Sequence, residues 1–116
     1  MYQTILKEIK NILTQNLDIK IDRIILFGSQ VAGNAEIGSD YDILIILENE
    51  YDWKIEDKIL DMCFEIDLKY DIVSDIKIIS TKELLEPRGK QLYIQNALKY
   101  GISAWIMKKK RNKSNN

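Results

Sequence analysis

An apolar run that ends in Gly-Ser, followed by a second apolar run that opens with two aspartates, constrains this chain most. Apolar residues 24–27 precede Gly28 and Ser29, while Asp40 and Asp42 stand at the start of the second run. Side chains of a strand alternate between its faces, so both aspartates would point the same way. Two carboxylates ~5 Å apart repel by roughly 3 kcal/mol at an effective dielectric constant of about 20. A bound cation offsets such repulsion, and oxygen ligands suit Mg²⁺, so the pattern predicts a magnesium site.

Gly28 and Ser29 add groups that suit a phosphate chain. A glycine after a strand lets the backbone approach a ligand closely or adopt a positive φ. Ser29 brings a hydroxyl and a backbone donor, and such donors beside a divalent ion suit a polyphosphate. Together with the aspartates they predict a metal–nucleotide site for phosphoryl or nucleotidyl transfer.

The spacing of these residues resembles that of a known family. A Gly-Ser pair (Gly28-Ser29), ten further residues, and then Asp-x-Asp at the start of a strand (Asp40, Asp42) are the signature of the polymerase-β-like nucleotidyltransferases. At 116 residues the chain looks like the minimal nucleotidyltransferase (MNT) branch, which includes antitoxins paired with HEPN-domain toxins. The resemblance covers residues 5–106. It implies an α+β fold in which a small mixed β-sheet has helices packed on one face and carboxylates on the other.

The same resemblance implies roles for these residues. Asp40 and Asp42 would be catalytic and would share one or two Mg²⁺ ions. Gly28 and Ser29 would bind the nucleotide by holding the β- and γ-phosphates of ATP, which is the donor. In the antitoxin branch AMP goes to a tyrosine hydroxyl of the partner HEPN toxin.

A third metal carboxylate is expected on the next strand, because the family places one there. Asp75 is preferred, since it lies inside the apolar run of this strand, beside the first pair of aspartates. It would ligate the catalytic ion and act as the base toward the attacking hydroxyl. Asp71 is the alternative, at the strand entrance, where an acidic residue is commonly only solvated.

One departure from the family pattern affects the expected activity. The family often has Gly-Ser-Arg-x-Arg-Gly, whereas here residues 28–33 read Gly-Ser-Gln-Val-Ala-Gly, so both arginines are absent. A guanidinium near the phosphates would offset their charge. Lys77 and Arg88 are candidate replacements. The alternative hypothesis is a catalytically weak or inactive domain that neutralises or assembles with a partner by binding. A small-molecule nucleotidyltransferase is a third hypothesis, although 116 residues leave little room for an acceptor domain.

Composition limits the other function classes. The chain has no histidine, which excludes histidine general bases and histidine-ligated zinc. Five basic residues lie in the tail 108–116, and removing their charges from the formal net charge of −1 leaves −6 on the rest. An acidic body disfavours nucleic-acid binding except weakly through that tail. No apolar run reaches the ~20 residues of a membrane span. Since a single cysteine, Cys63, cannot form an internal disulfide, a cytoplasmic location fits.

Periodicity and turn residues predict one domain over 1–107 and a basic, disordered tail over 108–116. The predicted elements are a helix over 3–16, strands over 22–27 and 40–47, a helix over 53–69, a strand over 70–80, a helical turn over 81–86, a helix over 88–99 and an edge strand over 102–107.

Individual residues are expected to set several of these boundaries. Asp52 and Thr81 are candidate N-caps, and Pro87 should break the helical turn. Gly101 should end the last helix in a left-handed conformation. Trp53 is expected to pack against the sheet. The acceptor, the nucleotide preference, the catalytic competence of the site and a homo-oligomeric state stay open at this point.

Overall fold

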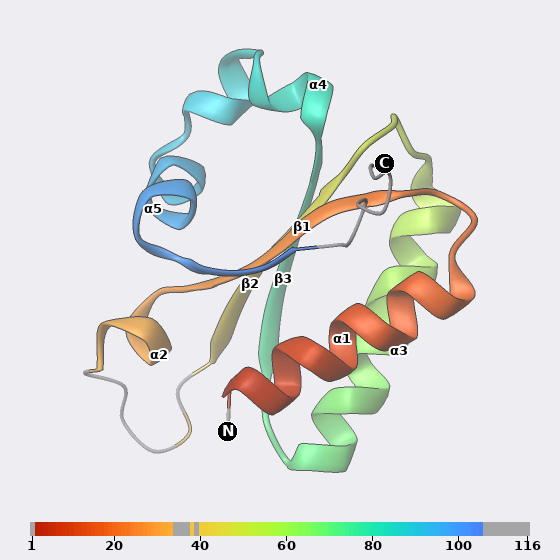
Figure 1. Ribbon diagram of the computed structural model, residues 1–116, viewed down its shortest axis with the longest axis vertical. Helices are drawn as coiled ribbons and strands as arrows, with labels where there is room; N and C mark the ends of the chain where they lie inside the picture. The colour runs from red at the N-terminus through yellow and green to blue at the C-terminus, as the bar shows by residue number, and fades with distance from the viewer. Residues whose placement is uncertain (1, 34–37, 39, 106–116) are drawn as a thin grey trace, which may run out of the picture.

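The computed structural model describes residues 2–33, 38 and 40–105, which form one four-stranded sheet with helices on both of its faces (Figure 1). The elements are α1 (Tyr2–Asn16), β1 (Ile21–Phe27), α2 (Ser29–Ala32), β2 (Tyr41–Leu47), α3 (Trp53–Tyr70), β3 (Ser74–Ser80), α4 (Thr81–Leu84), η1 (Pro87–Lys90), α5 (Leu92–Tyr100) and β4 (Ile102–Trp105).

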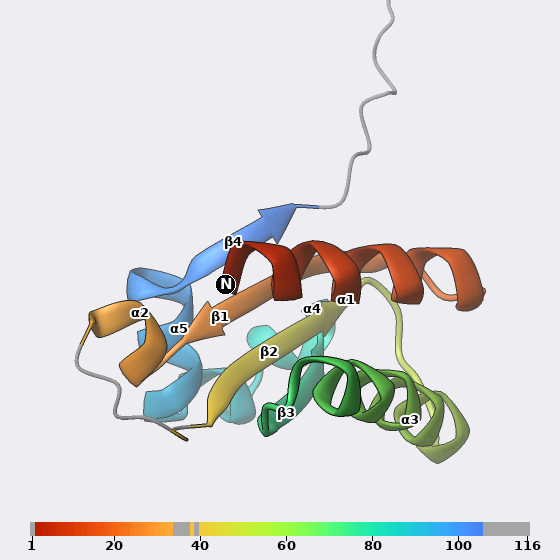
Figure 2. The same cartoon turned by 90° about the horizontal axis from the view of Figure 1, so that it is seen from below.

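The strand order, β3-β2-β1-β4, brings the predicted motif residues to one end of the sheet. β1 pairs antiparallel with β2 and β4, whereas β2 pairs parallel with β3. The parallel pair needs a crossover, and α3 supplies it. Because β2 and β3 run the same way and β1 runs against them, the end of β1 lies beside the starts of β2 and β3 (Figure 2).

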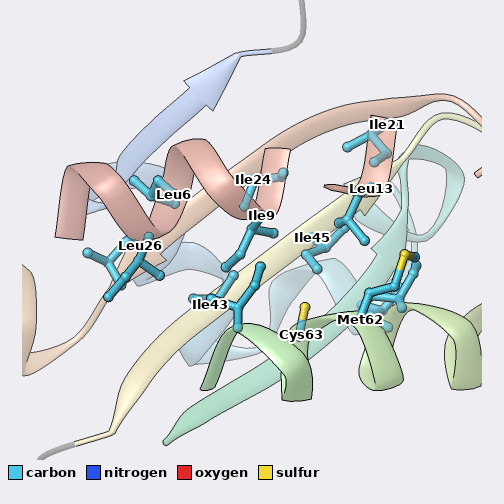
Figure 3. Close-up of a cluster of buried hydrophobic side chains, with 14 of the residues drawn as sticks. Leu6, Ile9, Leu13, Ile21, Ile24, Leu26, Ile43, Ile45, Met62 and Cys63 are labelled. Atoms are coloured by element: carbon cyan, nitrogen blue, oxygen red, sulfur yellow. The ribbon is translucent and has the colours of Figure 1, made fainter. Parts of the chain in front are cut away.

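The larger core lies between the sheet and the two long helices, α1 and α3. Its fully buried side chains alternate along the strands, as a helix-covered sheet face requires. Figure 3 shows that Ile9 and Leu13 of α1 face Ile43 and Ile45 of β2, while Cys63 approaches from α3. Each Ile or Leu buried in this way contributes about 1.5–3 kcal/mol. Cys63 is core packing, as expected, and burial raises the pKa of its thiol to about 12.

The opposite face of the sheet carries a smaller core beneath α5 and α4. It contains Ile25, Leu44, Ile46 and Ile79 with α5 residues Ile94 and Ala97. The prediction of an α+β fold with a mixed sheet is confirmed, and the two long helices do share one face. The structure adds that the other face, where the carboxylates lie, is also covered by short helices farther along the strands.

The crossover helix begins as predicted and ends later than predicted. Asp52 caps α3, since its Oδ1 accepts hydrogen bonds from the backbone N–H groups of Lys54 and Ile55, both at 3.1 Å. α3 continues to Tyr70, and Asp71 follows it with φ 54° and ψ 51°, a left-handed helix end. The prediction of a strand over 70–80 was therefore wrong at its start, because β3 begins at Ser74.

Other boundary predictions also need correction. Ser80, not Thr81, caps α4, in a capping box with Glu83. Gly101 is extended (φ −75°, ψ 165°) rather than left-handed. Its lack of a side chain matters for packing instead, because a Cβ there would lie 2.3 Å from Ile25 Cγ2. Trp53 does not pack on the sheet, since 67% of its surface is exposed.

The structure corrects the expected course of the chain after β1 and before α5, and it does not describe the C-terminal residues. Residues 30–32, which lie at the start of the connection expected between the first two strands, belong to the short helix α2. The 3-10 helix η1 precedes α5, whose start was predicted four residues too early. The tail 108–116 and residues 106–107 of the edge strand lie outside the described residues. Within the described part of the chain, no helix is long and apolar enough to cross a membrane.

Candidate active site

Asp42 occupies the centre of the site, because strand register places it between the two other predicted parts of the motif. Asp42 is opposite Phe27, the last residue of β1, and beside Asp75 of β3. Directly paired residues of neighbouring strands present their side chains on the same face. Asp42 and Asp75 therefore share the α5 face of the sheet. Asp71 pairs with neither strand, since it lies in the turn after α3.

Gly28 allows the chain to turn directly against the Asp42 carboxylate. Its backbone has φ 81° and ψ −155°, a region open essentially to glycine alone. A Cβ built at Gly28 would lie 2.2 Å from Asp42 Oδ2, so the contact also excludes any side chain. Ser29 follows at once and begins α2 (Figure 1).

Asp42 is partly buried and lies close to other negatively charged side chains. Burial raises the pKa of its carboxyl group, and the charges of Asp75 and Asp40 raise it further, while Lys77 opposes them. Asp40 itself is exposed and immediately precedes β2. Asp75 and Asp40 thus act electrostatically on Asp42.

The ammonium group of Lys77 neutralises part of this negative charge through an ion pair with Asp75. Its Nζ lies 3.1 Å from Asp75 Oδ1 and 5.9 Å from the centroid of the Tyr93 ring. Within residues 2–33, 38 and 40–105, no three acidic, cysteine or histidine side chains already converge as a metal-ligand set. The residues nevertheless fit a divalent cation, because the donors are all carboxylate oxygens and Asp42 repels its acidic neighbours. Such an ion would compete with Lys77 for Asp75.

Arg88, the other candidate for the missing arginines, is engaged at the far end of β3. It donates to Glu83 Oε2 at 2.8 Å and to the Ile78 carbonyl oxygen at 2.9 Å. Although burial opposes its charge, hydrogen bonds to Glu83 and Tyr51 raise its pKa. Arg88 therefore serves the packing of α4 and η1, and Lys77 is the cation that lies at the carboxylates.

A cleft of about 760 Å³ opens beside the Gly-Ser turn. Its lining combines the end of β1, α2 and one side of α5, namely Phe27, Gly28, Ser29, Val31, Tyr93, Asn96 and Tyr100. Sequence reasoning assigned no site role to the three α5 residues. A signal was present, since positions 93, 96 and 100 are spaced by three and four and so share one helix face. Only the packing of α5 on β1 shows which face that is.

The chain matches known proteins over most of its length. A family model described as "Polymerase beta, Nucleotidyltransferase" matches residues 7–101. A Methanocaldococcus jannaschii protein named "Putative protein adenylyltransferase MJ0141" is 35% identical over 98 residues, 84% of this chain and 93% of that protein. "Putative protein adenylyltransferase MJ0604", from the same organism, is 32% identical over 96 residues, 83% of this chain and 90% of that protein.

Solved structures share the fold. The crystal structure of a toxin-antitoxin with AMP-PNP aligns with a TM-score of 0.62 and 20% identity, covering 90% of this chain and 75% of that chain. A mutant of the toxin-antitoxin MntA-HpeT aligns with a TM-score of 0.61 and 18% identity over the same shares. At these identities the likeness concerns the fold.

Proposed function

This chain belongs to the polymerase β nucleotidyltransferase family, and on that premise we propose that it transfers AMP from Mg²⁺-ATP to a tyrosine hydroxyl of a HEPN-domain toxin, for which it is the antitoxin. Two relatives bear names that call them protein adenylyltransferases, which supports a protein as the acceptor. Two fold neighbours are toxin-antitoxin structures, one of them with AMP-PNP, which supports a toxin partner and ATP. A cytoplasmic setting suits the buried thiol of Cys63.

The observation that carries the proposal is the position of Asp42. It lies beside Asp75 in the sheet and in contact range of Gly28, so acidic oxygens and a side-chain-free turn meet at one point. Fold stability does not account for this arrangement, because like charges at the end of a sheet repel one another and destabilise the fold. A site that binds a cation and a phosphate chain explains all three residues together.

In the proposed reaction the tyrosine oxygen attacks the α-phosphorus of ATP and pyrophosphate leaves. Asp75 accepts the hydroxyl proton, and Asp40, Asp42 and Asp75 would hold the divalent metal. Mg²⁺ bound there would supply charge neutralisation and a lower pKa for the attacking hydroxyl. Gly28 and Ser29 position the β- and γ-phosphates with backbone N–H groups and the Ser29 hydroxyl. Positioning and electrostatics supply most of the rate enhancement.

Lys77 is proposed to supply the positive charge that the missing arginines would provide. It reaches Asp75 from the same strand, because residues 75 and 77 share one face. An ammonium is a point charge without the bidentate geometry of a guanidinium. We therefore expect Lys77 to turn from Asp75 toward phosphate oxygens when Mg²⁺-ATP enters.

Transfer of label from ATP to the partner tests this function. The protein, its cognate HEPN partner, Mg²⁺ and ATP labelled at the α-phosphate are incubated together. Label should appear on the wild-type partner, fall at least about 100-fold with Asp42→Asn, and be unaffected by Asp18→Asn, an exposed aspartate that follows α1. Absence of label with every variant, or equal labelling with wild type and Asp42→Asn, would reject the enzymatic proposal.

A second candidate function, neutralisation by binding alone, is favoured by the outer face of α3. Four of its apolar side chains are exposed at helical spacing: Trp53 (67%), Leu60 (39%), Phe64 (59%) and Leu68 (67%). We define these four residues as the α3 stripe. Asp57, Asp61 and Glu65 follow one another at steps of four on the same exposed side. Such a surface suits an amphipathic partner helix with apolar anchors and basic flanks.

If binding alone neutralises the toxin, the complex forms without ATP and survives Asp40→Asn. Size-exclusion chromatography of the two proteins measures this directly. The binding-only function is rejected if a correctly folded Asp40→Asn variant no longer forms the complex, or if complex formation without AMP transfer leaves the toxin active.

A further inference from the structure

We propose that the cleft between the Gly-Ser turn and α5 binds the adenine base of the nucleotide donor, with Tyr93 and Tyr100 as aromatic walls and Asn96 as the group that reads the base. This inference rests on the proposed function, because it assumes a nucleotide whose phosphates lie at Gly28 and Ser29.

The position of the cleft suits a nucleotide that extends from the Gly-Ser turn into the cleft. Gly28 and Ser29 line the cleft and also form the turn against Asp42. A ligand whose phosphates lie at this turn can therefore extend into the cleft without crossing the sheet. Its volume of about 760 Å³ lies within the usual range for small-molecule sites, ~300–1,000 Å³.

The lining has the chemistry of a base site. Three aromatic side chains, Phe27, Tyr93 and Tyr100, contribute to it, and every nucleobase can stack on an aromatic ring. Tyr100 keeps 64% of its surface exposed, and within the described part of the chain its ring interacts with the Lys99 ammonium, 5.3 Å from the ring centroid. An exposed ring at a cleft wall is available for stacking.

Asn96 supplies polar discrimination. Its exposed side-chain amide makes no hydrogen bond to any other residue that the structure describes. An amide offers a donor and an acceptor side by side, and this pair matches the N7 acceptor and N6 donor of adenine. Guanine presents two acceptors on the corresponding edge, so the same amide meets it less well. We therefore expect ATP to be preferred to GTP.

The strand order separates this cleft from the acceptor. Asp75, the proposed base, lies on the edge strand β3, whereas the cleft lies on the β1 side, with β2 between them. An acceptor hydroxyl has to meet Asp75, so it approaches from the β3 edge. The β1 side is then left for the donor.

Equilibrium binding measurements distinguish the contribution of the base to affinity from that of the phosphates. Isothermal titration calorimetry compares Mg²⁺-ATP, Mg²⁺-GTP and Mg²⁺-tripolyphosphate, which lacks base and ribose. Tyr100→Ala should weaken ATP binding by roughly 5- to 100-fold and leave tripolyphosphate binding unchanged. Tyr100→Phe, which keeps the ring, should retain ATP affinity. Phe64→Ala removes a similarly exposed ring (59%) from α3 and should change neither ligand.

Asn96→Ala tests discrimination in the same titrations. The ratio of ATP to GTP affinity should fall by roughly tenfold, because the variant loses the amide that distinguishes the two bases. Tripolyphosphate affinity should again be unchanged. An affinity ratio identical to that of wild type overturns the assignment of Asn96.

Other outcomes overturn the base site as a whole. If Tyr100→Ala weakens ATP and tripolyphosphate equally, the side chain acts only by supporting the phosphate turn. If ATP binding is intact while AMP transfer to the partner falls, the cleft holds the acceptor instead. A wild-type protein that binds neither ligand rejects the proposed function itself, which distinguishes that failure from a failure of the base site.

Discussion

At the scale of single residues, Asp42 bears an energetic cost that the rest of the fold tolerates. Burial and the charges of Asp75 and Asp40 raise its pKa above the ordinary value of 3.8. In the folded state its proton is therefore held to higher pH than in the unfolded state. The contribution of Asp42 to stability is most favourable below pH 3.8 and is lost as the pH rises through the folded pKa.

We predict that Asp42→Asn stabilises the metal-free protein at pH 7 by about 1 kcal/mol, because the variant removes one of the repelling charges. The melting temperature should rise by a few degrees. The gain should disappear below pH 3.8, where Asp42 is protonated in both states. Differential scanning calorimetry at pH 3 and pH 7 measures both effects, with Asp61→Asn as the exposed control.

Mg²⁺ should act on the same repulsion. Added Mg²⁺ is expected to raise the melting temperature of the wild type and to have little effect on Asp42→Asn. Equal shifts in the two proteins would contradict a metal site at Asp42, because non-specific ion effects do not depend on this side chain.

Gly28 and Gly33 have the same positive φ but differ in the atoms that surround them. Both have φ 81°, yet a Cβ at Gly33 would meet nothing within 4 Å, whereas one at Gly28 would lie 2.2 Å from Asp42 Oδ2. Gly33→Ala should cost only about 1 kcal/mol of backbone strain. Gly28→Ala should cost about 2–3 kcal/mol and should also displace the Asp42 carboxylate.

Chemical denaturation and Mg²⁺-ATP titration check this pair of variants. The Gly28 variant should lose affinity for Mg²⁺-ATP at least tenfold, and the Gly33 variant should keep it. If both variants lose affinity to the same extent, the contact with Asp42 is not what the site requires.

At the scale of elements, the sequence predicts whether a segment is a helix or a strand better than it predicts where that helix or strand begins and ends. The apolar spacing of α3 and the aspartate cap at its start are local, so both could be identified without coordinates. The residues after Tyr70 could not, because Asp71 ends α3 in a left-handed conformation that its residue type alone does not require. Likewise, Ser80 and Thr81 are both good caps, and only the reciprocal bonds of Glu83 decide for Ser80.

The capping box at α4 gives a prediction of pH dependence. Burial opposes the charge of Glu83, but the Ser80 N–H and Arg88 more than compensate and lower its pKa below 4.5. A lowered folded pKa stabilises the protein above the unfolded value, and this stabilisation is lost as the pH falls through the folded pKa. Glu83→Gln should therefore cost about 1–2 kcal/mol above pH 5.

Urea denaturation between pH 3 and pH 7 measures this difference. It should shrink toward zero as the pH falls below 4.5. Glu86→Gln, an exposed neighbour, should follow the wild type throughout. A difference that does not vary with pH would show that Glu83 stabilises α4 through packing rather than charge.

At the scale of the whole molecule, the site depends on contacts between segments distant in sequence. The Gly-Ser and Asp-x-Asp spacing predicts two parts of it, because β1 and β2 are consecutive. Asp75 could only be preferred over Asp71, since the register of β2 with β3 is a tertiary property. The α5 wall of the cleft could not be placed at all, because nothing local indicates that α5 returns to the end of β1.

The α3 stripe and the carboxylates face different sides of the molecule, yet they come together at the β3 edge. The apolar exposure of α3 continues past Leu68 to Val73, which is 58% exposed and directly precedes β3. Asp75 follows two residues later. A partner helix docked along α3 would thus end close to Asp75, on the side from which an acceptor has to approach.

We therefore predict that Phe64→Ser separates assembly from nucleotide binding. Phe64 lies at the middle of the stripe, where anchors of an interface are most sensitive, so affinity for the HEPN partner should fall at least tenfold. Mg²⁺-ATP affinity should be unchanged, because the cleft and the carboxylates lie on the opposite face of the sheet. AMP transfer should fall at low partner concentration and recover as the partner is raised to saturation. Leu85→Ser, which alters an 88% exposed leucine after α4, is the control and should match the wild type. If Leu85→Ser weakens the complex and Phe64→Ser does not, the partner docks over α4 and the acceptor reaches the site by another path.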